Sequence, residues 1–96
     1  METLPPVPER PALAKRARMR FDKTRDSHVL LLPERVVMLS ESAAEILELC
    51  NGERTAAEIA AELKSRYEEA PLAELEADVN EFLREAVARK WLERTE

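Results

Sequence analysis

The stretch that decides the fold is VLLLPERVVMLS, residues 29–40. Two apolar runs, residues 29–32 and 35–39, are separated only by Pro33 and Glu34, which predicts a tight turn between two antiparallel strands. Neither run alternates apolar with polar residues, although a hairpin with one face in water should alternate. The pattern therefore predicts a strand at 35–39 whose second face needs cover and whose free edge needs a partner.

The residues before this hairpin predict a third strand. In RARMRF, Ala17, Met19 and Phe21 stand at every second position, which is the period of a half-buried strand. The polar residues 23–27 favour a turn. Short links of this kind predict a three-stranded antiparallel meander with strands at 16–21, 28–32 and 35–39.

After residue 40 the apolar period becomes helical, and three helices are expected. The first places Ala43, Ile46, Leu47 and Cys50 on one face and ends near Gly52. The second begins at a capping box formed by Thr55 and Glu58. The third begins near Pro71 and carries a long apolar stripe: Leu72, Leu75, Val79, Phe82, Leu83, Ala86 and Val87.

The cap of the first helix has two candidates. Ser42 and Glu45 have the spacing of a capping box, and Ser40 is the alternative cap. With either cap, the order of elements is three strands followed by three helices, so the fold class is α+β.

A chain of 96 residues makes one domain. Residues 1–15 are rich in proline, which cannot donate a backbone hydrogen bond, and are expected to form a flexible arm outside the core. Residues 16–96 are expected to form the folded domain.

The net charge of −5 is unevenly distributed: residues 9–26 carry a net +4 and residues 27–96 a net −8. The basic segment is either a solvated surface or a contact for an acidic partner, including the chain's own acidic helices. No apolar run approaches the roughly 18 residues of a membrane span, and the first residues lack an apolar signal-peptide core. We expect a cytoplasmic protein that does not contact the membrane.

The sequence offers little chemistry. Cys50 and His28, the only cysteine and histidine, could form a nucleophile and base, but Cys50 lies on an apolar helix stripe and fits a small core residue better. Acidic pairs such as Glu68 and Glu69 are typical of solvated helix faces, and one glycine cannot build a phosphate loop. We expect no catalysis, no cofactor and no metal.

The second and third helices resemble a helix-turn-helix, which makes a winged-helix DNA-binding regulator an alternative. The third helix is acidic, however, with a net −2 over residues 72–90. Because DNA affinity depends on cations against phosphates, this charge argues against nucleic acid as a partner.

The segment RMRFDKTRDSHVLLLPERVVMLSESAAEILELCNGERTAAEIAAEL resembles the PqqD family, the small peptide chaperones of pyrroloquinoline quinone biosynthesis. The likeness runs from about residue 10 to 93. Its features include Arg20-Phe21-Asp22, Leu31 to Val36, Leu39, Ala44, Ile46-Leu47, Leu49-Cys50, Gly52, Thr55 and Glu58-Ile59, and LEADVNEFLREAVARKWLE looks like the family's final helix. Ser40 stands where the family would have Asn, and serine caps a helix equally well.

This resemblance implies a winged-helix-like, peptide-binding domain related to the RiPP recognition elements. Such a protein would bind the ribosomal precursor peptide of the cofactor and present it to a radical S-adenosylmethionine (SAM) enzyme, without a cofactor or reaction of its own. In related domains the peptide lies as an added strand along the third strand, in a groove bounded by the third helix.

An edge strand offers unpaired N–H and C=O groups, and a peptide can pair with them by β-augmentation. The expected template is the strand of Arg35, Val36, Val37, Met38 and Leu39. Val36 and Met38 would point to one face and Val37 and Leu39 to the other, and the pattern leaves open which pair meets the helices. The alternative is that all four side chains belong to the core.

The groove wall would come from the stripe of the third helix beside its core-facing residues: Asp78, Glu81, Phe82, Glu85 and Arg89. Solvated helix surface is the other interpretation of the charged positions. A homodimer that pairs the strand 35–39 with its own copy would explain the apolar edge equally well.

Overall fold

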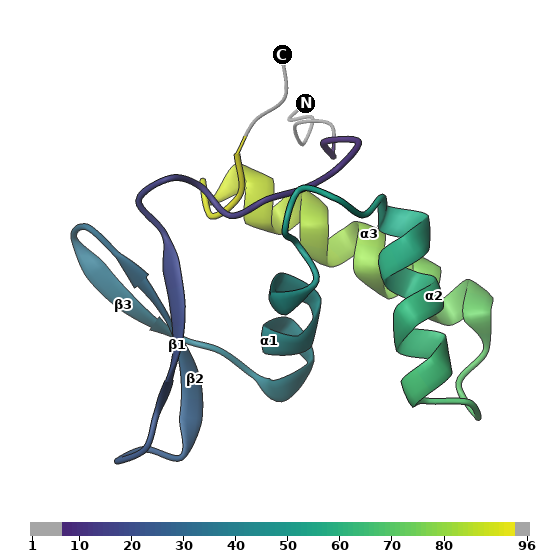
Figure 1. The fold of residues 1–96 in the computed structure, drawn as a ribbon, viewed down its shortest axis with the longest axis horizontal. Helices are drawn as coiled ribbons and strands as arrows, with labels where there is room; N and C mark the ends of the chain where they lie inside the picture. The colour runs from purple at the N-terminus through teal and green to yellow at the C-terminus, as the bar shows by residue number, and fades with distance from the viewer. Residues whose placement is uncertain (1–6, 94–96) are drawn as a thin grey trace, which may run out of the picture.

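A computed structural model describes residues 7–93 of the chain. Three strands precede three helices, as predicted, and the helices lie on one side of the sheet (Figure 1). The elements are β1 (Arg18–Asp22), β2 (Ser27–Leu32), β3 (Arg35–Met38), α1 (Glu41–Glu48), α2 (Ala56–Arg66) and α3 (Leu72–Ala88). The α+β fold class is confirmed.

The sheet is an antiparallel meander in the order β1-β2-β3. Met19 pairs with Leu30, and Leu30 pairs with Val37, so these three side chains share the face that meets the helices. The opposite face, called here the outer face, carries alternate residues such as Arg20, which pairs with Val29. The predicted strand boundaries agree with the structure to within two residues at each end.

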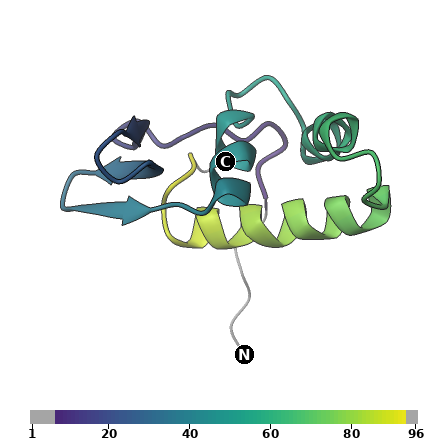
Figure 2. The same ribbon diagram turned by 90° about the horizontal axis from the view of Figure 1, so that it is seen from below.

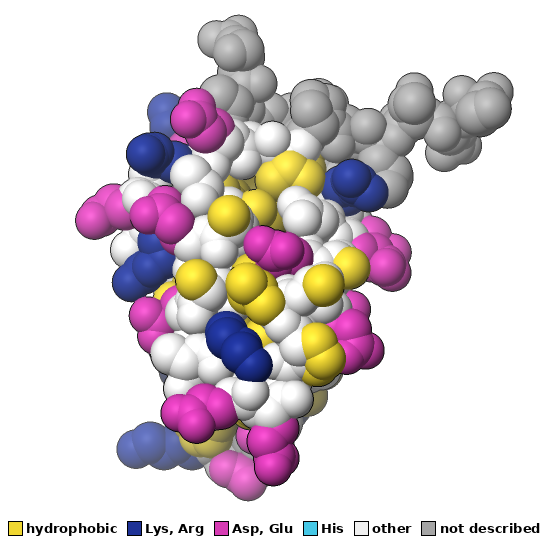
Figure 3. All heavy atoms as spheres, turned by 90° about the vertical axis from the view of Figure 1, so that its right-hand side faces the viewer, with side chains coloured by type: hydrophobic (Ala, Val, Ile, Leu, Met, Phe, Trp, Pro, Cys, Tyr) yellow, Lys and Arg dark blue, Asp and Glu magenta, His cyan; other side chains and the backbone are white. Residues whose placement is uncertain are grey.

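The core lies between the inner face of the sheet and the three helices. α3 runs below α1 and α2 as the longest element, and β3 points toward its C-terminal end (Figure 2). Residues of β2, the three helices and the two chain segments that flank the fold make up the fully buried set, whose largest members are Leu30, Leu47, Ile59, Leu83 and Leu92. Burying each of these side chains stabilises the fold by about 1.5–3 kcal/mol. Figure 3 views the end of the molecule remote from the sheet, where apolar side chains are exposed between charged ones.

The helix starts follow from local hydrogen bonds. Ser40 caps α1 by accepting a hydrogen bond from the backbone N–H of Ala43, so the expected capping box at Ser42 is wrong. Ser42 lies inside the first turn, where its hydroxyl meets that of Ser40. The box at Thr55 and Glu58 is confirmed, since each side chain bonds the other residue's backbone N–H.

The N-terminal segment packs against the fold, so the prediction that residues 1–15 form a flexible arm outside the core is wrong for residues 11–14. Pro11 is fully buried, and its carbonyl accepts a hydrogen bond from Gly52. Ala12 and Leu13 form bridges to Asn51 and Leu92. Prolines fit here because the segment is extended and uses mainly its carbonyls as acceptors. Residues 1–6 of the predicted arm and 94–96 of the predicted domain lie outside the described residues.

α3 ends in a turn that was not among the sequence predictions. Lys90 adopts the left-handed conformation, with φ 67°, at a position where helices usually place glycine. The N–H of Trp91 donates to the carbonyl of Ala86, and the N–H of Lys90 donates to that of Val87, which together form a Schellman motif. The motif turns the chain back so that Trp91 and Leu92 enter the core.

Candidate functional site

β3 is an edge strand whose two faces differ sharply. Val36 and Met38 are 55% and 51% exposed, whereas Val37 is half-buried against the core and Leu39 is buried. The structure thus decides which pair meets the helices: Val37 and Leu39 do. The interpretation that all four side chains belong to the core is wrong, because the strand pleat directs alternate residues to opposite faces.

The free edge of β3 presents backbone groups at defined residues. The N–H of Leu39 donates to the carbonyl of His28, and antiparallel pairing alternates between bonded and non-bonded residues. In the register of the β2–β3 pair, Val37 and Arg35 therefore also point their backbone groups toward β2. It follows that Val36 and Met38 direct their N–H and C=O groups to the free edge.

Long side chains partly cover the outer face of the sheet. The Nη1 of Arg25 lies 3.3 Å from the Sδ of Met38, and Val29 is only 3% exposed although it lies on this face. Arginine stems shield apolar surface while their charged heads remain in water. This cover explains why the strands of the hairpin can be apolar on both faces.

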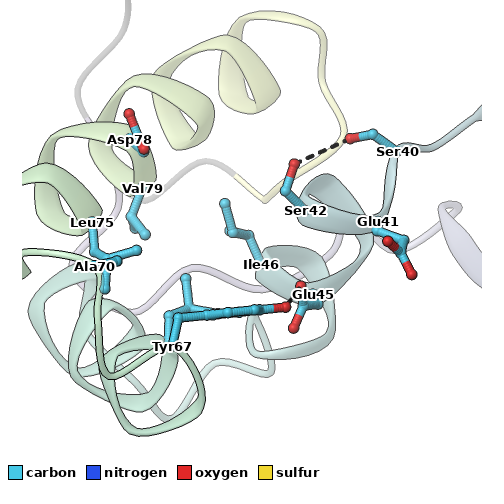
Figure 4. Close-up of a pocket in the computed structure, with 11 residues that line it drawn as sticks. Ser40, Glu41, Ser42, Glu45, Ile46, Tyr67, Ala70, Leu75, Asp78 and Val79 are labelled. Atoms are coloured by element: carbon cyan, nitrogen blue, oxygen red, sulfur yellow. Dashed lines mark hydrogen bonds between the residues drawn. The ribbon is translucent and has the colours of Figure 1, made fainter.

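A hollow of about 520 Å³ lies between the three helices, next to the end of β3 (Figure 4). We call it the apolar hollow. Its wall is formed by Ile46, Leu63, Leu75 and Val79, and its rim by Ser40, Glu41, Ser42, Glu45, Tyr67, Ala70 and Asp78. Such a lining suits an apolar group held under a polar and acidic rim.

Tyr67 and Glu45 form one side of the rim. The Tyr67 hydroxyl donates to Oε1 of Glu45, and the two side chains meet in Figure 4. Glu45 also lies 3.7 Å from Nη1 of Arg66. The hydrogen bond to Glu45, followed by desolvation, raises the pKa of Tyr67 above its ordinary value.

A second hollow, of about 320 Å³, lies beside the β2–β3 turn and the end of α3. We call it the basic hollow. Four cationic side chains line it, together with one carboxylate and four apolar residues: Arg16, Arg35, Arg89, Lys90, Glu34, Ala14, Ala17, Leu32 and Pro33. The two ends of β3 therefore meet two hollows of opposite character.

The predicted residues of the third helix are distributed along α3. Asp78 lines the apolar hollow, and Arg89 lines the basic hollow together with Arg35. Glu81 and Glu85 lie between them along the helix and are exposed. Phe82 is half-buried against the core, with its ring centroid 6.4 Å from that of Trp91.

The structure gives no support to Cys50 as a catalytic nucleophile. Its thiol is buried, donates to the carbonyl of Ile46, and burial raises its pKa to about 12, so it is not a thiolate at neutral pH. Within residues 7–93, no group of three or more His, Cys, Asp or Glu side chains is placed to hold a metal. No helix among the described residues is long and apolar enough to cross a bilayer.

Sequence reasoning missed several residues of the two hollows. Tyr67 was not among the predicted site residues; it caps the end of α2 and is 48% exposed. Arg16 and Lys90 come from segments that are distant in sequence and meet only in the fold. A usable signal for Lys90 was the apolar pair Trp91-Leu92 directly after a helix, since a Schellman motif places an apolar residue at that position.

Comparisons with known proteins agree with this arrangement. The family model described as "Coenzyme PQQ synthesis protein D (PqqD)" matches residues 27–92. The chain is 44% identical over 82 residues to a protein of Rahnella aquatilis named "PqqA binding protein", covering 85% of this chain and 84% of that protein. It is 41% identical over 91 residues to a protein of the same name from Pseudomonas paraeruginosa, covering 95% and 97%.

Two solved structures share the fold. The solution NMR structure of the PqqD truncation of Methylobacterium extorquens PqqCD, described as a functional and stand-alone RiPP recognition element, matches with a TM-score of 0.74 and 39% identity, covering 88% of each chain. The crystal structure of PqqD from Xanthomonas campestris matches with a TM-score of 0.58 and 34% identity, covering 86% of this chain and 91% of that one. These relatives are named for binding and recognition rather than for a reaction.

Proposed function

The chain belongs to the PqqD family, and from this membership we propose that it is a non-catalytic chaperone that binds the precursor peptide PqqA by strand addition to β3. It then presents the peptide to the radical SAM enzyme of the same pathway. Because the peptide is a ribosomal product, we place this binding in the cytoplasm. The domain that acts in this way comprises residues 16–96, with residues 11–14 packed against it.

The observation that carries the proposal is the free edge of β3. Val36 and Met38 expose their side chains and direct their backbone groups away from β2. An extended peptide that pairs with these groups gains main-chain hydrogen bonds, and its alternate side chains reach the neighbouring surface. Val37 and Leu39 then support the strand from the core side. Arg35 and the α3 residues Asp78, Glu81, Phe82, Glu85 and Arg89 complete the proposed site.

A backbone-amide NMR titration with PqqA tests the proposal. We expect the largest shifts in β3, at Val36 and Met38 above all, and along α3. Shifts confined to other elements, with β3 and α3 silent, would contradict it. Adding the radical enzyme to the complex tests presentation. The amide resonances of β3 must keep their peptide-bound chemical shifts, while amide resonances from a separate surface broaden.

Proline variants sharpen the test. Val36→Pro and Met38→Pro each remove an N–H that faces the proposed peptide and leave the β2–β3 hydrogen bonds in place. Phe21→Pro is the matched control, since the alternation directs its N–H to the opposite free edge of the sheet. We expect the β3 variants to fold and lose binding and the control to bind. Normal binding by both folded β3 variants refutes strand addition.

Self-pairing of β3 in a homodimer is the competing use of the same edge. Sedimentation with and without PqqA separates the two. A monomer that stays monomeric with peptide bound supports the proposal, whereas a dimer that keeps β3 protected when PqqA is added supports self-pairing.

A further inference from the structure

The basic hollow concentrates positive charge in an acidic protein. The chain has a net charge of −5, yet four cations and only one carboxylate line this hollow. Among residues 7–93, the ion pairs within 4.0 Å involve other side chains, at Asp22, His28, Arg66 and their partners. Arg16, Arg35, Arg89 and Lys90 therefore face the hollow without a carboxylate at that distance in the described part of the chain.

The backbone at Lys90 adds a second observation. A residue with a Cβ is strained in the left-handed conformation, and glycine would relieve this strain. Strained positions that persist are typical of functional sites. Here the strained residue carries a cation into the hollow.

Two further contacts position Arg89 and the N-terminal segment that precedes Arg16. The guanidinium carbon of Arg89 lies 5.5 Å from the ring centroid of Trp91, whose side chain is buried. The N–H of Ala14 donates to the carbonyl of Trp91, which ties the segment before Arg16 to the turn after α3. The cations thus come from an ordered surface that joins the N-terminal segment, β3 and α3.

The hollow lies at the start of β3, because Arg35 is both the first residue of β3 and part of its lining, so one end of a strand added to β3 would lie near it. At the other end of β3, the rim of the apolar hollow carries Glu41, Glu45 and Asp78, which repel carboxylates. The two ends of the proposed peptide path therefore favour opposite charges.

We propose that the basic hollow binds an acidic segment of the peptide, so that peptide carboxylates face Arg16, Arg35, Arg89 and Lys90. This inference rests on the proposed function and deepens it. The charge difference between the two hollows then selects one direction of the added strand, since the reversed peptide would bring its carboxylates to the acidic rim.

Binding by variants tests the proposal with PqqA as the probe, measured by titration calorimetry at low and high salt. We expect Arg16→Gln, Arg89→Gln and Lys90→Gln each to weaken binding by about two- to fivefold, the range for partly exposed charge pairs. Each should also reduce the salt dependence of Kd. Arg84→Gln is the control, because Arg84 is an exposed cation of α3 outside this hollow, and it should leave Kd unchanged.

Lys90→Gly separates a binding role from a structural one. Glycine relieves the left-handed backbone, so we expect Tm to rise by roughly 2–5 °C while PqqA binding weakens. Asp26→Gly is the matched control: Asp26 also has a positive φ, of 53°, but lies in the β1–β2 turn at the other end of the sheet. It should leave binding unchanged.

PqqA variants with Asp and Glu replaced by Asn and Gln locate the carboxylates. Some of these peptide variants should bind the wild-type protein more weakly than PqqA does. We expect the same peptide variants to bind Lys90→Gln and Arg89→Gln as tightly as PqqA itself binds those protein variants. A spin label beside the carboxylates that these peptide variants identify should broaden amides near Pro33 rather than near Ser40. Unchanged binding of the amide variants, or broadening near Ser40, overturns the proposal, and so does occupation of the hollow by inorganic phosphate or an RNA oligonucleotide in place of peptide carboxylates.

Failure of this inference can be distinguished from failure of the proposed strand addition. If Val36→Pro and Met38→Pro abolish binding but the cation variants and amide peptides bind normally, the peptide occupies β3 and the inference about its acidic segment is wrong. If the proline variants also bind normally, the proposed function is wrong.

Discussion

The hydroxyl of Tyr67 donates a hydrogen bond of 2.5 Å to Oε1 of Glu45, which joins the end of α2 to α1 across 22 residues of sequence. Both side chains belong to the rim of the apolar hollow. The contact therefore links α1 to the end of α2 at the rim of this hollow, and it makes the tyrosine a spectroscopic probe of the site.

Alkaline titration of the folded protein should show Tyr67 ionising above its ordinary pKa of 10.0, because the hydrogen bond to Glu45 favours the protonated phenol. Tyr67 is the only tyrosine, so phenolate absorbance reports it alone. Glu45→Ala should lower this pKa toward its ordinary value. The contact stabilises the fold below pH 10 and is lost as the pH rises through the raised pKa. An unchanged midpoint in Glu45→Ala would show that the bond does not form in solution.

Thr55→Ala should destabilise the protein by about 1 kcal/mol, since it removes the side-chain acceptor at the start of α2. The hydrogen bonds with Thr55 lower the pKa of Glu58, so the capping box contributes stability above pH 4.5 that is lost as the pH falls through the lowered pKa. Urea unfolding at pH 7 and pH 3 measures both effects. The difference between wild type and Thr55→Ala should be smaller at pH 3, and an equal difference at both pH values would contradict this account.

Deleting residues 1–14 should destabilise the fold, although the sequence predicted a flexible arm outside the core. The deletion removes four backbone hydrogen bonds, from Gly52 to Pro11, from Ala14 to Trp91, from Glu93 to Ala12 and from Ala17 to Ala14. At about 0.5–1.5 kcal/mol each, and with the burial of Pro11 lost as well, we expect a decrease of about 3 kcal/mol in the free energy of unfolding. Deleting residues 1–6 is the comparison that leaves these bonds intact. Equal stability of the 1–14 deletion and wild type would refute the packing of this segment.

Substitutions of Trp91 test how much a buried, unpaired hydrogen-bond donor lowers the free energy of unfolding. Its indole Nε1 is buried and has no hydrogen-bond partner among the described residues. Trp91→Phe loses apolar contacts but also removes the unpaired N–H, so we expect a change of less than about 1.5 kcal/mol in the free energy of unfolding. Trp91→Ala leaves a cavity and should cost about 3–5 kcal/mol. Similar losses in both variants would indicate that the N–H is paired in solution.

Much of the fold could be predicted because the relevant signals are local. The period-two pattern of residues 16–21, the Pro33-Glu34 turn and the helical stripes each depend on neighbours within a few residues. The capping box at Thr55 belongs to the same class. The choice of Ser40 over Ser42 was open, because both offer a suitable hydroxyl and only the path of the chain leaving β3 selects between them.

The candidate site was predicted less completely, because it depends on contacts between distant segments. The alternation along residues 35–39 established two faces for the strand, and only the register against β2 decided that Val37 and Leu39 face the helices. Nothing in the sequence distinguishes Arg16 and Lys90 from other surface cations. They line one hollow with Arg35 because the Schellman turn and the N-terminal segment meet beside β3. By itself the sequence determined which elements form and in what order, since backbone propensity and side-chain period act over single turns. Tertiary structure alone decided which side chains share a surface, since burial and electrostatics act through space.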